Sequence, residues 1–109
     1  MTEPRDASAV AELADVILVA LGLRVLALVL CPPRADGRPR ILVLADELPP
    51  PAERAAFLAS RTPTGSLGEA EIVLKTPAEV AAEGPAAQAE LAVGRILLDR
   101  GGIAQAQLR

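Results

Sequence analysis

The chain has 109 residues, a net charge of −3 and 51% apolar residues, with one Phe and no Tyr, Trp or His. This length suits a single domain over residues 1–109, and the aliphatic content is sufficient for a core. Without His, the commonest general base and metal ligand is missing. Without a basic face or stacking aromatics, nucleic-acid binding is not expected. We expect no metal and no cofactor.

The N-terminal segment predicts one helix. Met1–Arg5 is expected to be frayed, and Asp6 suits the N-cap of a helix that ends at about Leu21, before Gly22. Apolar residues recur at helical spacing on one stripe. The stripe consists of Val10, Leu13, Ala14, Ile17, Leu18 and Leu21.

Two aliphatic runs follow and predict an antiparallel hairpin. The first strand is expected from about Arg24 to Leu30 and the second over Arg40–Ala45. Both runs are too short for buried helices and rich in β-forming residues, so we expect strands covered on both faces. The loop between them contains Pro32-Pro33 and Asp36-Gly37, which favour a chain reversal.

The apolar residues of this region also indicate whether the chain enters a membrane and in which compartment it folds. The apolar stretch Val16–Cys31 falls short of the roughly 20 residues of a spanning helix and contains Arg24. Acidic residues precede it, unlike the basic start of a signal peptide. Cys31, the single cysteine, cannot form an internal disulfide and is expected to be a buried apolar residue. We therefore expect a soluble cytoplasmic protein with no membrane association.

The second half continues the alternation of helices and strands. A helix is predicted from the prolines at 49–51 to about Ser60, and a half-exposed strand over Glu71–Thr76. The sequence Thr76-Pro77-Ala78-Glu79 predicts a capping box that starts a short helix, which Gly84-Pro85 ends.

The last segment has two interpretations. In one, a helix runs over Ala86–Arg100 and ends at Gly101-Gly102. In the other, the helix ends near Gly94, and Arg95–Leu98 forms a hairpin with Ile103–Leu108. Either version gives an α+β fold, with an antiparallel sheet of three to five strands and helices packed against it.

Arg24 is the first candidate binding residue. An arginine beside a doubly covered strand can bind a carboxylate bidentately, because its planar fork matches two oxygens. The alternative is a structural ion pair with Glu12, Asp46 or Glu47.

Two further groups of residues are candidates for binding an anion. The basic hairpin loop, with Arg34, Arg38 and Arg40, would attract an anionic ligand or partner, or would simply be solvated. Backbone amides in the loop around Gly65 and Gly68 would cradle an anion, although no Walker sequence is present.

The order of these pieces resembles the chorismate–pyruvate lyase family. The resemblance covers about residues 23–72, with a weaker continuation over 93–108. The matching segments are Leu23–Leu30, Asp36–Pro39, Ile41–Ala45, Leu48-Pro49, Phe57-Leu58 and Ser66–Glu69. The chain is much shorter than the family, and a helix replaces the strands that precede the arginine.

The resemblance implies specific roles for four residues. Arg24 would hold a carboxylate of chorismate, and Leu67 and Gly68 would line the pocket. The family glutamate that assists elimination of pyruvate falls at about Gln107, which cannot ionise. The resemblance therefore implies binding of a small carboxylated ligand with weak or absent lyase activity, and leaves open whether the protein is an enzyme.

The alternative function is a non-enzymatic interaction subunit. Aliphatic residues are in excess, and no ionisable constellation stands out. Such a subunit would form a homo-oligomer or a complex with a protein partner through an apolar surface.

Overall fold

The computed structural model describes residues 4–32, 37–68, 70–102 and 106, with side chains from residue 10 onward. Four strands form one sheet in the order β3-β2-β1-β4. The strands are β1 (Val25–Cys31), β2 (Arg40–Ala45), β3 (Glu71–Lys75) and β4 (Arg95–Asp99). The β1–β2 and β1–β4 pairs are antiparallel, whereas β2–β3 is parallel. The predicted α+β class is confirmed, and the predicted antiparallel pairing is found in two of the three strand pairs, whereas β2–β3 makes the sheet mixed.

The predicted hairpin forms the centre of this sheet. Leu28 lies opposite Val43 and Leu30 opposite Ile41 in the β1–β2 register. Each of the two strands has another strand on its outer side, and every β2 residue after Arg40 is buried. The aliphatic runs are therefore covered on both faces, as expected for strands without a polar face.

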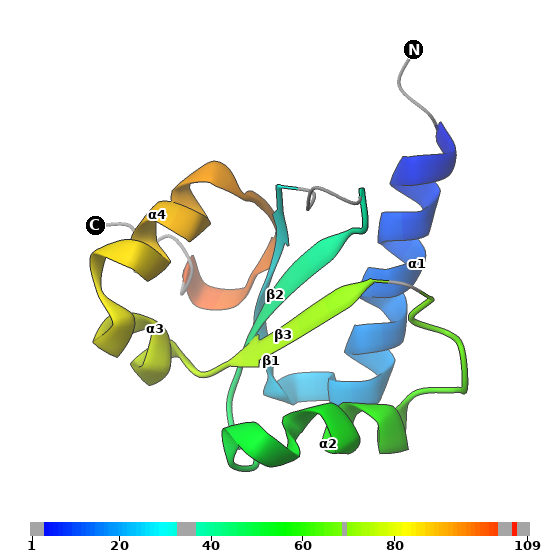
Figure 1. Ribbon diagram of the computed structural model, residues 1–109, viewed down its shortest axis with the longest axis horizontal. Helices are drawn as coiled ribbons and strands as arrows, with labels where there is room; N and C mark the ends of the chain where they lie inside the picture. Colours follow the sequence, from blue (N-terminus) through cyan, green and yellow to red (C-terminus); the bar gives the residue numbers. More distant parts are fainter. Residues whose placement is uncertain (1–3, 33–36, 69, 103–105, 107–109) are drawn as a thin grey trace.

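Helices cover the two faces of the sheet (Figure 1). On one face lie α1 (Pro4–Leu21) and α2 (Arg54–Arg61), the latter preceded by the 3-10 turn η2 (Pro51–Glu53). On the other face lie α3 (Pro77–Glu83) and α4 (Pro85–Val93). The parallel pairing of β2 and β3 follows from the crossover through α2, because adjacent parallel strands need such a connection.

Residues of β2 alternate between two apolar cores. Ile41 and Val43 belong to the core under α1 and α2, and Leu42 and Leu44 to the core under α3 and α4. The first core also contains Leu13, Ile17, Leu21, Val25, Leu28, Ala45, Leu58 and Leu74. The second also contains Ala27, Val29, Cys31, Val80, Ala87 and Leu91.

The N-terminal boundaries differ slightly from the prediction. Helix α1 begins at Pro4, so Pro4 and Arg5 are helical and not frayed as expected, while residues 1–3 lie outside the described chain. Between α1 and β1, the 3-10 turn η1 (Gly22–Arg24) contains Gly22 with φ 58°, which glycine adopts readily. Arg24 therefore precedes β1 instead of opening it. Among the described residues, no helix is both long and apolar enough to cross a membrane.

The predicted capping box at the start of α3 is confirmed. The Thr76 hydroxyl oxygen accepts a hydrogen bond from the Glu79 N–H at 3.2 Å, and Glu79 Oε1 accepts one from the Thr76 N–H at 2.9 Å. This reciprocal pair satisfies two backbone donors that the start of a helix leaves unpaired.

At the C-terminal end, the interpretation with the shorter helix is confirmed. Helix α4 ends at Val93, and β4 follows and pairs with β1. A Cβ on Gly94 would lie 2.6 Å from Cγ1 of buried Val29, so this turn approaches β1 too closely for a side chain. The continuous helix over Ala86–Arg100 is wrong. Of the predicted strand Ile103–Leu108, only Ala106 is described, and its backbone is helical; the rest lies outside the described residues.

Candidate functional site

Arg24 ends η1 at the entrance to β1, and its side chain packs against α2. The Arg24 guanidinium carbon lies 5.6 Å from the centroid of the Phe57 ring. Its Nε is buried and has no hydrogen-bond partner. Among the described residues, no ion pair joins Arg24 to any acid, including the candidate partners Glu12, Asp46 and Glu47. The alternative interpretation of Arg24 as half of a structural ion pair is therefore not seen.

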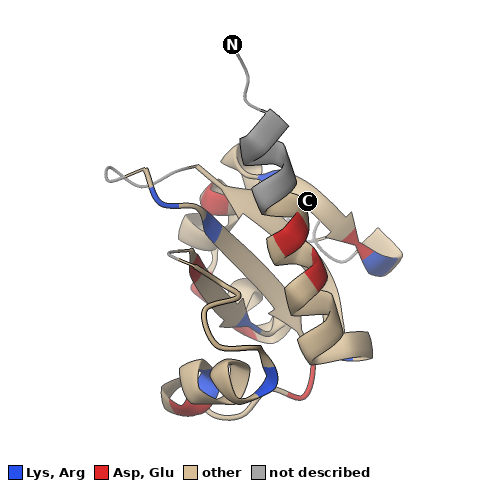
Figure 2. Cartoon of the chain, turned by 90° about the vertical axis from the view of Figure 1, so that its right-hand side faces the viewer, with Lys and Arg blue, Asp and Glu red and all other residues tan. Residues whose placement is uncertain are grey.

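A second arginine contacts the same ring. Arg61 is one helical turn after Phe57 on α2, and its guanidinium carbon lies 4.4 Å from the ring centroid. Each cation is attracted to the ring, but the two like charges repel each other. No acid in the described part of the chain pairs with Arg61. We call Arg24, Phe57 and Arg61 the arginine–Phe57 cluster. Figure 2 shows basic residues, in blue, on the helix at the bottom of the view.

Leu67 and Gly68 lie elsewhere. Both line an open hollow of about 420 Å³ beside α2, and both also line a hollow of about 270 Å³ on the α1 side of their loop. Arg24 lines neither of these two hollows. The fourth candidate, Gln107, lies outside the described residues.

The loop that contains Leu67 uses much of its polar capacity internally. The Thr62 hydroxyl donates to the Leu58 carbonyl oxygen at 3.1 Å, and the Ser66 hydroxyl donates to the Pro63 carbonyl oxygen at 2.7 Å. The Ser66 and Gly68 N–H groups donate to carbonyls within the loop. These two amides are therefore not free to cradle an anion.

The basic hairpin loop is also partly neutralised. Arg40 forms ion pairs with Glu90, at 3.1 Å, and with Glu71, at 3.8 Å. Burial alone would lower the pKa of Arg40, but its hydrogen bond to Glu90 and the attraction of that carboxylate raise the pKa above its usual value. Arg38 is exposed, and Arg34 lies outside the described residues.

The remaining candidates for nucleophilic or metal-binding chemistry in the described chain are the Cys31 thiol and the acidic side chains. Cys31 is buried, as predicted, and burial raises the pKa of its thiol, which lowers the thiolate fraction. No group of three or more potential metal-ligating side chains occurs among the described residues. Asp46 and Glu47 are exposed at the end of β2.

Comparison with known proteins adds no relative: no family model, curated protein or solved structure matches this chain. The resemblance to chorismate–pyruvate lyases stays a prediction from the sequence.

Sequence reasoning missed two members of the arginine–Phe57 cluster. In the sequence, Phe57 stands out only as part of the family resemblance, and nothing assigns Arg61 to a binding site. A signal was nevertheless present, because the single aromatic residue of the chain is followed four positions later by an arginine. The third member, Arg24, lies more than thirty residues earlier, so local spacing gives no indication of its contact.

Proposed function

We propose that this protein binds a small carboxylated ligand at the arginine–Phe57 cluster. One observation supports the proposal above all others: two guanidinium groups share one aromatic ring, and neither pairs with an acid in the described chain. A bound carboxylate would relieve the repulsion between the two cations and would accept charge-assisted hydrogen bonds.

Phe57 contributes by restricting the two side chains. Arginine carries considerable rotamer entropy, and contact with a ring limits the conformations of the guanidinium before a ligand arrives. Because burial of the Arg24 Nε leaves one side of the group inaccessible, a ligand would approach its Nη atoms. A carboxylate fits this approach, because two oxygens can engage guanidinium N–H groups together.

Any lyase turnover is proposed to be weak or absent. The position of the family glutamate is occupied by Gln107, and an amide cannot transfer a proton as a carboxyl group does. The proposal is therefore a binding protein of the lyase type, acting without a cofactor. A reducing cytoplasm is the proposed compartment, because Cys31 is a free thiol.

Isothermal titration calorimetry with chorismate and 4-hydroxybenzoate tests the proposal. We expect saturable heat with the wild-type protein and at least tenfold weaker binding in Arg24→Ala and in Arg61→Ala, because each loses a charge-assisted contact. Arg95→Ala is the matched control: it removes one positive charge from an exposed position on β4.

Two results would overturn the proposal. One is the absence of heat with either carboxylate at millimolar concentration. The other is equal binding by wild type, Arg24→Ala and Arg61→Ala, since binding would then occur elsewhere.

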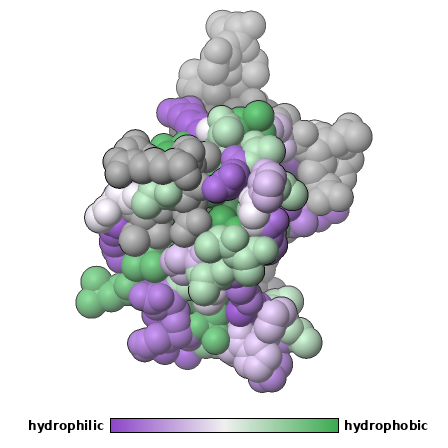
Figure 3. Space-filling model, turned by 90° about the vertical axis from the view of Figure 1, so that its left-hand side faces the viewer, coloured by the Kyte–Doolittle hydropathy of each residue, from purple (hydrophilic) through white to green (hydrophobic). Residues whose placement is uncertain are grey.

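A second candidate is an interaction subunit that associates with another copy of itself. Leu23 and Val19 are 91% and 86% exposed at neighbouring positions on the outer side of α1 and η1. The opposite side of the molecule, seen in Figure 3, mixes small apolar residues of α3 and α4 with hydrophilic ones. Native mass spectrometry tests this candidate: a dimer that Val19→Ser/Leu23→Ser dissociates would support it, and a wild-type monomer at 100 micromolar would exclude it, since ~100 micromolar exceeds the dissociation constants of stable dimers.

A further inference from the structure

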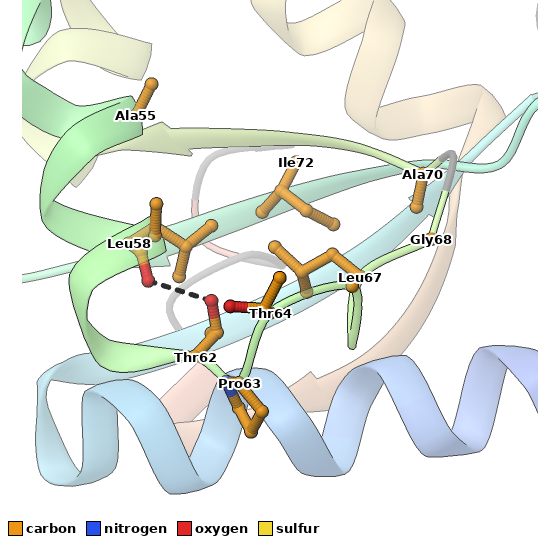
Figure 4. A pocket seen from close by; sticks show the side chains of 11 residues that line it. Ala55, Leu58, Thr62, Pro63, Thr64, Leu67, Gly68, Ala70 and Ile72 are labelled. Carbon is orange, nitrogen blue, oxygen red and sulfur yellow. Dashed lines mark hydrogen bonds between the residues drawn. The ribbon is translucent and has the colours of Figure 1, made fainter.

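The hollow beside Leu67 has a lining unlike that of the arginine–Phe57 cluster. It lies between α2, the loop over residues 62–68 and the start of β3 (Figure 4). Leu58, Leu67 and Ile72 converge on it, and none of the described side chains that line it is charged. The remaining lining residues are Ala55, Ala59, Thr62, Pro63, Thr64, Gly65, Gly68 and Ala70.

Two hydroxyl groups lie at this hollow, and only one is already bonded. Thr62 donates its hydroxyl to the Leu58 carbonyl oxygen, the contact dashed in Figure 4. The Thr64 hydroxyl has no hydrogen-bond partner among the described residues and lies beside Leu67 at the rim. Among the described side chains of this lining, Thr64 therefore supplies the one hydroxyl without a partner, and the other side chains apart from Thr62 are apolar.

This lining discriminates against charged molecules. A charged group that enters an apolar hollow loses hydration and needs a countercharge or several donors to compensate. The Ser66 and Gly68 amides donate to carbonyls within the loop, and no basic side chain of the described lining supplies a countercharge for an anion. An uncharged molecule with one hydroxyl or carbonyl group loses far less hydration free energy on entering the hollow.

We propose that this hollow is a second binding site, selective for a small uncharged molecule with a compact apolar body and one group that hydrogen-bonds to Thr64. Its volume of about 420 Å³ lies within the range of small-molecule sites, roughly 300–1,000 Å³. The site is independent of the carboxylate site, because Arg24 and Arg61 do not line it.

Leu67 gives the site a means of adjusting its size. The loop has hollows on both sides, and Leu67 and Gly68 belong to both linings. Gly65 and Gly68, on either side of Leu67, have φ of 78° and 57°, which glycine tolerates best. A change in the Leu67 rotamer would enlarge one hollow at the expense of the other.

A matched pair of probes tests the selectivity. Benzyl alcohol and benzoate share an aromatic body and differ in charge, and both are titrated into the ¹⁵N-labelled full chain by NMR. Benzyl alcohol is expected to shift the amide resonances of residues 62–68 and 72 in a saturable way. Benzoate is expected to shift those around Arg24, Phe57 and Arg61 instead.

Three variants assign the site. Ala55→Leu places a larger side chain in the hollow at an exposed, helix-compatible position, and should weaken benzyl alcohol binding at least tenfold. Thr64→Val removes the free hydroxyl and should weaken it about threefold to tenfold. Arg24→Ala should leave benzyl alcohol binding unchanged while it weakens benzoate binding at least tenfold.

The outcomes separate the two proposals. Absence of saturable shifts with benzyl alcohol, or shifts that survive Ala55→Leu in a variant with a wild-type circular dichroism spectrum, would overturn the hollow as a site. Loss of benzyl alcohol binding in Arg24→Ala would overturn its independence. If benzyl alcohol gives saturable shifts and benzoate gives none, only the proposed carboxylate site is overturned.

Discussion

Two arginines at α2 have opposite surroundings: Arg54 is the first residue of this helix, and Arg24 packs against it. Arg54 is 11% exposed, and its guanidinium donates to the carbonyl oxygens of Pro49 and Leu74 at 2.8 and 3.0 Å. It also donates to both carboxylate oxygens of Glu79, at 2.6 and 3.0 Å. Arg24, by contrast, contacts the Phe57 ring and no acid in the described chain. The guanidinium of Arg54 forms hydrogen bonds that connect parts of the fold. That of Arg24 forms none with an acid of the described chain, which is why we propose that it binds the ligand.

The Arg54 contacts connect three parts of the chain. Pro49 precedes η2, Leu74 is near the end of β3, and Glu79 belongs to the capping box of α3. The Glu79 carboxylate thus accepts from Arg54 and from the Thr76 N–H together. These bonds connect the helical layers on the two faces of the sheet around one edge.

Arg54→Ala should therefore be the most destabilising of the changes compared below. We expect the free energy of unfolding to fall by about 3 kcal/mol, because a charged partner and two carbonyl contacts disappear together. Arg24→Ala should cost less than about 1 kcal/mol, since no hydrogen bond is lost. Urea denaturation followed by circular dichroism measures both, and equal losses would contradict the distinction between the two arginines.

Glu79→Gln tests the Arg54–Glu79 contacts, which we call the clamp, with a smaller change. The hydrogen bond from Arg54 and those within the capping box lower the pKa of Glu79 from 4.5 to about 2. A carboxyl with a lowered folded-state pKa stabilises the fold above its unfolded-state pKa, and the contribution disappears as the pH falls from 4.5 toward 2. The wild type should lose stability across this window, and Glu79→Gln should lose less.

The measurement is urea unfolding at closely spaced pH values. At neutral pH, Glu79→Gln should already cost about 1–2 kcal/mol, since an amide keeps one acceptor but loses the charge. Glu53→Gln is the control, because Glu53 is an exposed acid on the preceding turn. Parallel pH curves for wild type and Glu79→Gln would show that the clamp does not stabilise the fold.

The Arg54–Glu79 contacts and the arginine–Phe57 cluster also show which features can be predicted from the sequence and which cannot. The Thr76–Glu79 capping box was predictable because its partners are three residues apart. The central hairpin was predictable because two aliphatic runs flank a loop of prolines and glycine. The Arg54–Glu79 bonds and the Arg24–Phe57 contact were not, because residues 25 and 33 positions apart meet only after the sheet has formed.

Two features of the fold were ambiguous for the same reason. The direction of β3 depends on the crossover through α2, and alternation within Glu71–Lys75 is equal for parallel and antiparallel pairing. Helix α4 is apolar on most of its surface, so helical periodicity did not define its end. The decisive constraint was the close approach of Gly94 to Val29, which is a tertiary contact.

Phe57→Leu tests the cluster without removing either charge. Loss of the ring removes two cation–π contacts, each about 0.5–1 kcal/mol at a partly exposed site. Because the ring restrains the arginines, binding of 4-hydroxybenzoate should weaken about threefold to tenfold. Ile72→Val, which trims a partly buried apolar side chain of β3 outside the cluster, is the calorimetric control. Unchanged affinity in Phe57→Leu would mean that the arginines need no ring to bind the ligand.

The smallest effect is expected where an ion pair is exposed. Lys75 Nζ lies 2.7 Å from Glu83 Oε1, a distance as short as those of the Arg54–Glu79 pair. The Glu83 side chain is 43% exposed, and among the described residues no carbonyl or second carboxylate oxygen adds to the contact. Glu83→Gln should therefore change the free energy of unfolding by less than about 0.5 kcal/mol. Urea unfolding in 0.05 and 0.5 M sodium chloride measures that difference. A loss as large as that of Glu79→Gln would mean that ion-pair distance, not burial and the number of hydrogen bonds, determines what these pairs contribute.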